Sequence, residues 1–114
     1  MAIKTIKNEL EAKLFPVGKT SFFSRPRGKI ERKEYADGKL RFKVLISNFK
    51  LPDGEEVELV ISDNLITKLK IKKGSAQIDL KSEIGADIPN VTEGDTAELR
   101  YQGNIIVKGR FVKD

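Results

Sequence analysis

The chain contains a segment of aromatic and basic residues, SFFSRPRGK, that could form a binding surface. It places Phe22 and Phe23 beside three cations: Arg25, Arg27 and Lys29. Aromatic rings stack on bases and cations neutralise phosphates, so this segment could contact single-stranded nucleic acid. It could also press into an anionic membrane surface. The sequence favours a third interpretation, in which the two phenylalanines close one end of the core, because only six Phe, two Tyr and no Trp are available to build it.

The net charge of +5 is concentrated near the N-terminus. Residues 1–29 contain seven Lys or Arg and two Glu, which gives +5, whereas residues 30–114 contain fifteen basic and fifteen acidic residues, which gives zero. A nucleic-acid-binding protein would therefore use the basic aromatic segment 19–29, and its binding would be weak and sensitive to salt. The sequence favours a non-enzymatic binding or structural module of undefined ligand, with nucleic-acid binding as the alternative.

Three further groups of basic residues each fall on one face of an expected strand: Lys39, Arg41 and Lys43; Lys68, Lys70 and Lys72; Lys108 and Arg110. If these strands were neighbours, they would form a cationic wall able to meet phosphates. The alternative, which the sequence favours, is that they prevent edge-to-edge aggregation and pair with the acidic strands 29–35 and 55–62.

Five carboxylates surround the longest connection after residue 29: Asp79, Glu83, Asp87, Glu93 and Asp95. A calcium ion needs several oxygens at such density, but the spacing follows no recognised loop and Lys81 lies among them. A carboxylate pair could also hydrolyse glycosides, but the chain has no tryptophan and few tyrosines to line a sugar cleft. The favoured interpretation is therefore that these carboxylates are exposed to solvent on a loop and bind no ligand.

The chain has neither cysteine nor histidine. This excludes disulfides, thiolate nucleophiles, cysteine and histidine metal ligands, and the usual general base near neutral pH. No glycine-rich loop of the P-loop or dinucleotide-binding type is present. The sequence therefore predicts a protein that is not an enzyme and that has no cofactor, metal or catalytic residue.

These residues must be positioned by strands, because alternation of apolar and polar residues dominates from residue 29 onward. Asp37-Gly38 predicts a tight hairpin between strands 29–35 and 39–49. Further strands are expected at 57–61, 65–72, 76–80, 95–101 and 105–112. In the strand 65–72, one face is expected to carry Leu65, Thr67, Leu69 and Ile71. The connection over 82–94 is expected to cross between two sheets, with Ile84, Ile88 and Val91 packed on the core, and Gly109 suggests a bulge or a close backbone approach.

The N-terminal residues are ambiguous. Ile3, Ile6, Leu10 and Leu14 have helical spacing, but Leu10, Ala12 and Leu14 also alternate with polar residues, and we favour an edge strand from about Lys7 to Val17. With 114 residues, which suits one domain, the chain is expected to form a single-domain, antiparallel, all-β sandwich or flattened barrel of about eight strands.

Several turn and core motifs support this fold: RFKVLISNFKLPDGEEVELVI, KKGSAQIDL, IPNVTEGD and GNIIVKGRF. Their pattern over residues 27–112 resembles that of small bacterial all-β proteins of uncharacterised function, whereas residues 1–26 match it poorly. The resemblance implies an all-β fold and carries no catalytic or ligand residues.

The chain contains no apolar run of about 18 residues and no signal-like opening, which predicts a cytoplasmic protein unless a leader was removed. A protein partner, or a second copy of the chain, is expected to pair through an exposed first or last strand.

Overall fold

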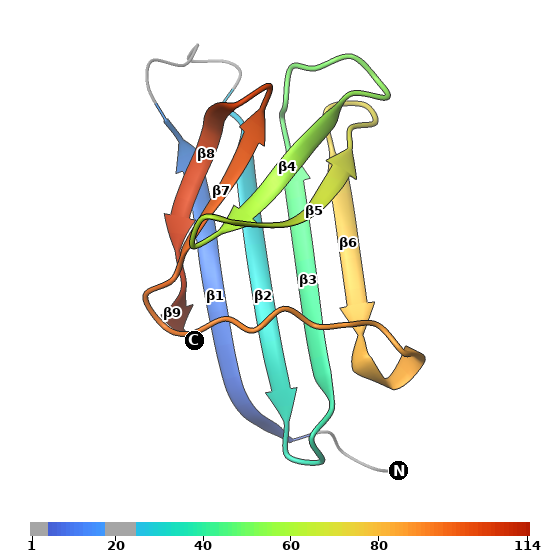
Figure 1. Cartoon of the computed structure of the whole chain (residues 1–114), viewed down its shortest axis with the longest axis vertical. Coiled ribbons are helices and arrows are strands. Elements are labelled where there is room, and N and C mark those ends of the chain that lie inside the picture. The colour runs from blue at the N-terminus through green and yellow to red at the C-terminus, as the bar shows by residue number, and fades with distance from the viewer. Residues whose placement is uncertain (1–4, 18–24) are drawn as a thin grey trace.

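The computed structural model describes residues 5–17 and 25–114, and these confirm the all-β, antiparallel prediction (Figure 1). The elements in chain order are β1 (Ile6–Pro16), β2 (Arg27–Tyr35), β3 (Leu40–Ser47), β4 (Glu56–Ile61), β5 (Asn64–Lys70), β6 (Ala76–Lys81), a 3-10 turn η1 (Ser82–Ile84), β7 (Thr96–Tyr101), β8 (Asn104–Arg110) and β9 (Val112–Lys113). Within the described residues, no helix is long and apolar enough to cross a membrane.

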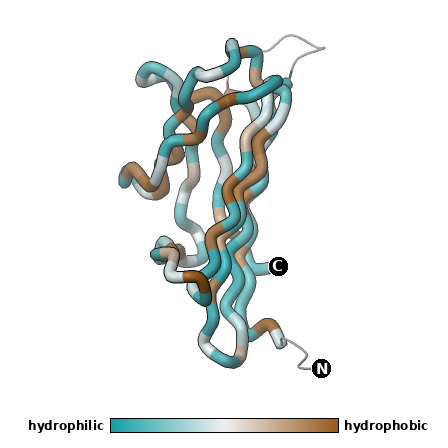
Figure 2. Tube along the Cα trace, turned by 90° about the vertical axis from the view of Figure 1, so that its right-hand side faces the viewer, coloured by the Kyte–Doolittle hydropathy of each residue, from teal (hydrophilic) through white to brown (hydrophobic). Residues whose placement is uncertain are grey.

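The strands form one sheet that is nearly closed into a barrel-like shape. Their order is β5-β4-β7-β8-β1-β2-β3-β6, and β9 pairs with β1. The end strands β5 and β6 are joined by a tight turn, where Lys72 bridges to Ser75, but they do not pair along their length. Figure 1 shows the layer of β1, β2, β3 and β6 behind the shorter strands, and Figure 2 shows these two layers from the side.

The core lies between the two layers and follows the alternation of the sequence. Its largest fully buried side chains include Phe42, Phe111, Leu14, Ile30 and Leu59. The Asp37-Gly38 hairpin joins β2 to β3 as predicted, with Gly38 at a φ of 88°, which glycine adopts without a steric penalty. Burial of the alternate apolar residues therefore fixes which face of each strand is left for binding.

The N-terminal strand is confirmed, but it is not an edge strand. β1 pairs with β2 on one side, and on the other side it pairs first with β9 and then with β8. The predicted final strand is accordingly divided into β8 and β9, because the chain changes its pairing partners near Gly109. The open edges of the sheet path belong to β5 and β6, so the prediction that the first strand is available for pairing with another chain is wrong.

Gly109 lies where two backbones approach each other closely, as the sequence predicts. A Cβ atom at this position would overlap the carbonyl oxygen of Lys13 and lie 2.9 Å from Leu14 Cδ2. On the other side of Leu14, a Cβ at Gly28 would lie 2.9 Å from Leu14 Cδ1. The two glycines therefore allow β1, with the residues on its outer face, to sit close to both neighbouring strands.

The connection between β6 and β7 crosses from one layer to the other, as predicted. Val91 is buried and Ile88 packs against the core, but Ile84 is 74% exposed, so its predicted packing is wrong. The 3-10 turn η1, which contains no buried residue, places Ile84 at the surface. The buried Arg32 also holds this connection, because its Nε donates a 2.8 Å hydrogen bond to the carbonyl of Pro89.

The predicted face of β5 is wrong at its start. Leu69 and Ile71 are buried, but Leu65 is 54% exposed, while Ile66 packs against the core. The cause is a bulge in β5: Leu59 of β4 pairs with Thr67, but the next residue, Val60, pairs with Leu65, so Ile66 is an extra residue. Such a bulge reverses the alternation beyond it, which a periodic pattern on one strand does not reveal.

The turn before β7 is held by Asp95. Its carboxylate accepts hydrogen bonds from the backbone N–H of Thr92, at 2.8 Å, and from the hydroxyl of Ser62, at 3.0 Å. These hydrogen bonds, above all the one from Thr92, hold the pKa of Asp95 below its ordinary value because they favour the charged form.

We expect Asp95→Asn to reduce the acid sensitivity of folding. A carboxyl group whose pKa is lowered by folding contributes stability above its unfolded pKa of about 4, and loses it as the pH falls through the lower folded value. Solvent screening limits the contribution to about 1 kcal/mol. In urea unfolding, the wild type should be more stable than the variant by this amount at neutral pH and equally stable near pH 2, to within about 0.3 kcal/mol. A difference that does not change with pH would contradict this assignment.

Candidate basic groove

The outer face of the β1–β2–β3–β6 layer carries a network of opposite charges over most of its length. Lys33 lies 3.8 Å from a Glu9 oxygen and 3.5 Å from a Glu31 oxygen. Arg41 donates hydrogen bonds of 2.9 and 2.6 Å to the two carboxylate oxygens of Asp79. Arg41 thereby holds the pKa of Asp79 below its ordinary value. This part of the face neutralises its own charge.

The network ends toward the carboxyl end of β1, where acidic residues are missing. One row across the layer contains Lys13, Lys29, Leu45 and Gln77, and the next places Arg27 opposite Ser47. A groove of about 800 Å³ opens here. We call it the basic groove and define it by its lining residues: Lys13, Leu14, Phe15, Arg27, Gly28, Lys29, Leu45, Ile46, Ser47, Lys70, Lys72, Ser75, Ala76 and Gln77.

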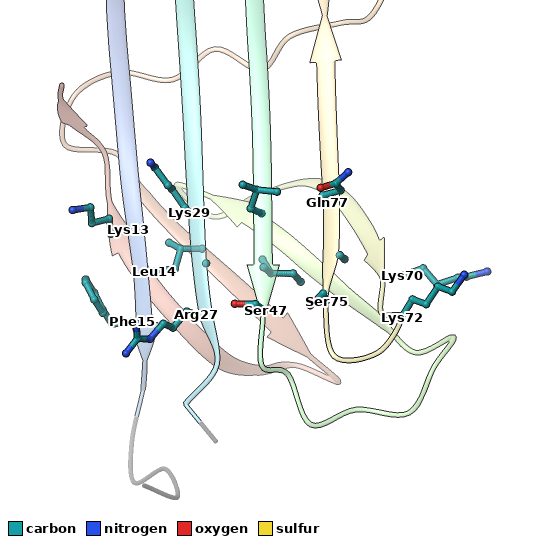
Figure 3. Close-up of a pocket in the computed structure, with 14 residues that line it drawn as sticks. Lys13, Leu14, Phe15, Arg27, Lys29, Ser47, Lys70, Lys72, Ser75 and Gln77 are labelled. Carbon is teal, nitrogen blue, oxygen red and sulfur yellow. The ribbon is translucent and has the colours of Figure 1, made fainter. Parts of the chain in front are cut away.

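Five of these residues are cations and none is a carboxylate. Figure 3 shows Lys13, Arg27 and Lys29 along β1 and β2, and Lys70 and Lys72 on the far side, beyond β6. Ser47, Ser75 and Gln77 lie between these two groups. The cations therefore flank a neutral floor that carries hydroxyl and amide groups, which can both donate and accept hydrogen bonds.

Lys29 connects the charge network to the groove. Its Nζ lies 3.0 Å from Glu31 and 3.4 Å from Glu11, and the hydrogen bond with Glu31 contributes most to raising the pKa of Lys29 above its ordinary value. By contrast, no carboxylate in the described parts of the chain forms an ion pair with the other four cations: Lys13, Arg27, Lys70 and Lys72. Their charge is available to a ligand.

Phe15 is the aromatic residue among the described residues that line the groove. It lies two residues beyond Lys13 on the outer face of β1 and opposite Lys108 of β8, and it is 60% exposed. The ring also borders a second, smaller hollow of about 450 Å³, lined by Glu11 and Lys13 of β1 and by residues of β8, β9 and the C-terminus. Phe15 is thus an exposed ring that separates two hollows, with cations on both sides.

The structure divides the binding segment predicted from the sequence. Arg27 and Lys29 line the basic groove, whereas Arg25 is exposed before β2 and is not part of the lining. Phe22 and Phe23 lie outside the described residues, so the prediction that they close the core stays a prediction.

The three basic groups do not form the wall that neighbouring strands would have produced. β3 pairs with β2 and β5 pairs with β4, so the favoured pairing with the two acidic strands is confirmed for the first two groups. It is wrong for Lys108 and Arg110, because β8 pairs with β7 and β1. Lys39 and Arg41 nevertheless form ion pairs elsewhere, with Asp37, Glu83 and Asp79. Lys70 and Lys72 join the groove across β6 instead.

Three of the five carboxylates around the long connection each have a separate partner. Asp79 pairs with Arg41, Glu83 lies 3.5 Å from Lys39, and Asp95 holds its own turn. In the parts of the chain described, no three carboxylates lie together as a metal site would require. Their arrangement is that of separate surface contacts.

The sequence analysis did not identify Phe15 and Lys13 as site residues. It also did not predict that they share a groove with Lys70 and Lys72. A signal for the first two was present, because Glu11, Lys13 and Phe15 occupy the polar side of an alternating strand, where a phenylalanine is out of place. The shared groove had no local signal in the sequence, because about 55 residues separate Lys13 and Phe15 from Lys70 and Lys72 along the chain. Only the position of β6 beside β3 brings these residues to one groove.

No protein-family model matches the chain, and no curated protein is similar to it in sequence. The resemblance to small bacterial all-β proteins therefore stays a prediction, and the chemistry of the basic groove is what indicates a function.

Proposed function

We propose that this protein is a non-enzymatic binding module that holds an extended polyanionic ligand in the basic groove. The observation that carries the proposal is the collection of five cations in one groove whose lining contains no carboxylate. On the rest of the same face, Lys and Arg are interspersed with Glu and Asp. The charge of the groove is therefore a local departure from a self-neutralising pattern, and it is complementary to an anion.

The separation of the cations favours a chain of negative charges over a single small anion. β1 and β6 are three strand spacings apart, which is about 14 Å. Lys70 belongs to β5 and lies beyond β6 (Figure 3), so a single phosphate or sulfate ion is too small to contact Lys13 and Lys70 together. A ligand with repeated anionic groups can cross the floor of the groove and contact both groups of cations.

The remaining groups of the groove suit binding better than chemistry. Its lining offers hydroxyls, one amide and one aromatic ring beside the cations, and the chain has no histidine or cysteine to act as a base or thiolate. These groups provide hydrogen bonds, stacking and charge, which together hold a ligand in place.

The double variant Arg27→Gln with Lys72→Gln tests this proposal. It removes one cation from each side of the groove, and we expect its affinity for inorganic polyphosphate at low salt to fall about tenfold, because each exposed cation contributes up to about 1 kcal/mol. Fluorescence anisotropy of a labelled polyphosphate would measure the change, with melting temperatures to show that the fold is kept.

The matched control is the double variant Lys7→Gln with Lys81→Gln. It lowers the net charge by the same amount at the opposite end of the layer, since Ile6 pairs with Tyr35 and Lys81 pairs with Arg41. We expect this control to change the affinity by less than about twofold. Equal losses in both variants would show that only the net charge matters and would refute binding in the groove.

A further inference from the structure

We infer that the polyanion is a single-stranded nucleic acid, with one base stacked on Phe15 and the adjoining phosphates on Lys13 and Arg27. This inference rests on the proposed function and names the ligand of the same groove. From Phe15, the strand continues over the floor toward Lys70 and Lys72.

The placement of Phe15 is the first argument. Its ring is 60% exposed, while Leu14 on the opposite face of β1 fills the core and is 1% exposed. The core therefore does not need the ring. Lys13 precedes it on the same face, and Arg27 lies beside it on β2 (Figure 3). An exposed ring between two cations that have no ion-pair partner among the described residues has the parts that a stacked base and its flanking phosphates require.

The floor of the groove is the second argument. Leu45, 38% exposed, offers an apolar surface at its centre. Ser47, Ser75 and Gln77 surround it with short polar groups that can donate or accept hydrogen bonds. A base has an apolar face and polar edges, so it matches this combination, whereas a sulfated or phosphorylated chain without bases would leave Leu45 and Phe15 uncovered.

The shape of the groove favours a single strand over a duplex. In a duplex the bases are stacked on one another, so none is available to stack on Phe15. A groove of about 800 Å³ is also too small to contain a double helix. The cations on both sides of a hollow floor further favour a strand that enters the groove over a flat membrane surface, which would rest on its rim.

Two probes of equal charge separate stacking from charge. One is an oligothymidylate of about 12 nucleotides, and the other is an oligomer of the same length made of abasic sugar phosphates. We expect the wild type to bind the oligothymidylate at least about fivefold more tightly than the abasic oligomer, because a stacked base contributes about 1–3 kcal/mol. A duplex carrying the same sequence should bind more weakly than the single strand.

The variant Phe15→Ala should lose about 5- to 100-fold in affinity for oligothymidylate and less than about twofold for the abasic oligomer and for polyphosphate. Phe15→Trp should retain the affinity for oligothymidylate, and its fluorescence should be quenched when the base stacks on it. Since the chain contains no other tryptophan, this signal reports on position 15 alone.

The outcomes distinguish this inference from the proposed function. If Phe15→Ala lowers the affinity for all probes equally, or for none, base stacking at Phe15 is refuted while polyphosphate binding still supports the groove. If the wild type binds polyphosphate or vesicles containing phosphatidylserine but no oligonucleotide, the nucleic-acid inference is refuted. If the wild type binds none of the probes, both proposals fail.

Discussion

Gly109→Ala is expected to destabilise the fold by about 3 kcal/mol or more, the upper part of the range for overpacked positions. The added Cβ would overlap the carbonyl oxygen of Lys13 and crowd Leu14 Cδ2 at 2.9 Å. A backbone carbonyl cannot move aside as the end of a flexible side chain can, so β8 and β1 would have to separate. The melting temperature should fall by roughly 10–20 °C, measured by circular dichroism.

Gly103→Ala provides the matched control. Gly103 has a φ of +81° and no atom within 4 Å of an added Cβ, so this variant meets only the backbone cost of the left-handed conformation, about 1–2 kcal/mol. If Gly109→Ala were no more destabilising than Gly103→Ala, the close approach of β1 and β8 would be refuted.

A destabilised Gly109→Ala variant should also bind its ligand less well at temperatures where it is still folded. Lys13 and Phe15 belong to the segment of β1 that this approach positions. Separation of β1 from β8 would displace the ring and the cation from the basic groove. Both the contact between β1 and β8 and the geometry of the groove therefore depend on the absence of a Cβ at Gly109.

Phe111→Ala is expected to cost about 3–5 kcal/mol, a large share of the stability of a domain of this size. The side chain of Phe111 is completely buried where the chain leaves β8 for β9. Its backbone N–H donates to the carbonyl of Asp95 at 2.9 Å, and its carbonyl accepts from Gly94 at 2.8 Å. The substitution keeps both backbone hydrogen bonds, so the loss would report the cavity left by the ring.

Urea unfolding of three variants would test this prediction. Phe111→Leu, which retains most of the volume, should cost less than about 1.5 kcal/mol. Phe15→Ala removes the same ring from an exposed position and should change the stability by less than about 0.5 kcal/mol. A cost for Phe15→Ala close to that of Phe111→Ala would show that Phe15 supports the core, and would remove the main reason for assigning it to a ligand.

Much of the fold could be predicted from the sequence because its signals are local. The Asp37-Gly38 turn and the alternation in β2 and β3 each act within a few residues, and the structure confirms both. The glycine in β8 gave a local signal of a close backbone approach, which the structure confirms, although its partner on β1 is distant in the sequence. The sequence did not reveal the exposed Ile84 or the reversed face at Leu65, because a short 3-10 turn decided the first and a one-residue bulge at Ile66 in β5 decided the second. Neither leaves a periodic signal in its own segment.

The site was predicted less completely than the fold. The excess of positive charge in residues 1–29 drew attention to Arg27 and Lys29, which line the groove. Phe15 was treated only as part of a strand, because alternation shows that a residue faces outward but not what lies beside it. The neighbours of Phe15 depend on the position of β1 between β8 and β2, which only the strand order of the sheet shows.

The sequence by itself determined the strand content, most of the turns, the buried face of most strands and the excess of cations near the N-terminus. These follow from backbone geometry and from the cost of exposing apolar residues, which act on each segment separately. Only the tertiary structure decided that β6 follows β3, that Lys70 and Lys72 face the same groove as Lys13 and Arg27, and that no carboxylate lines it. Strand order depends on how the whole chain closes around one core, so distant charges become neighbours only through the fold.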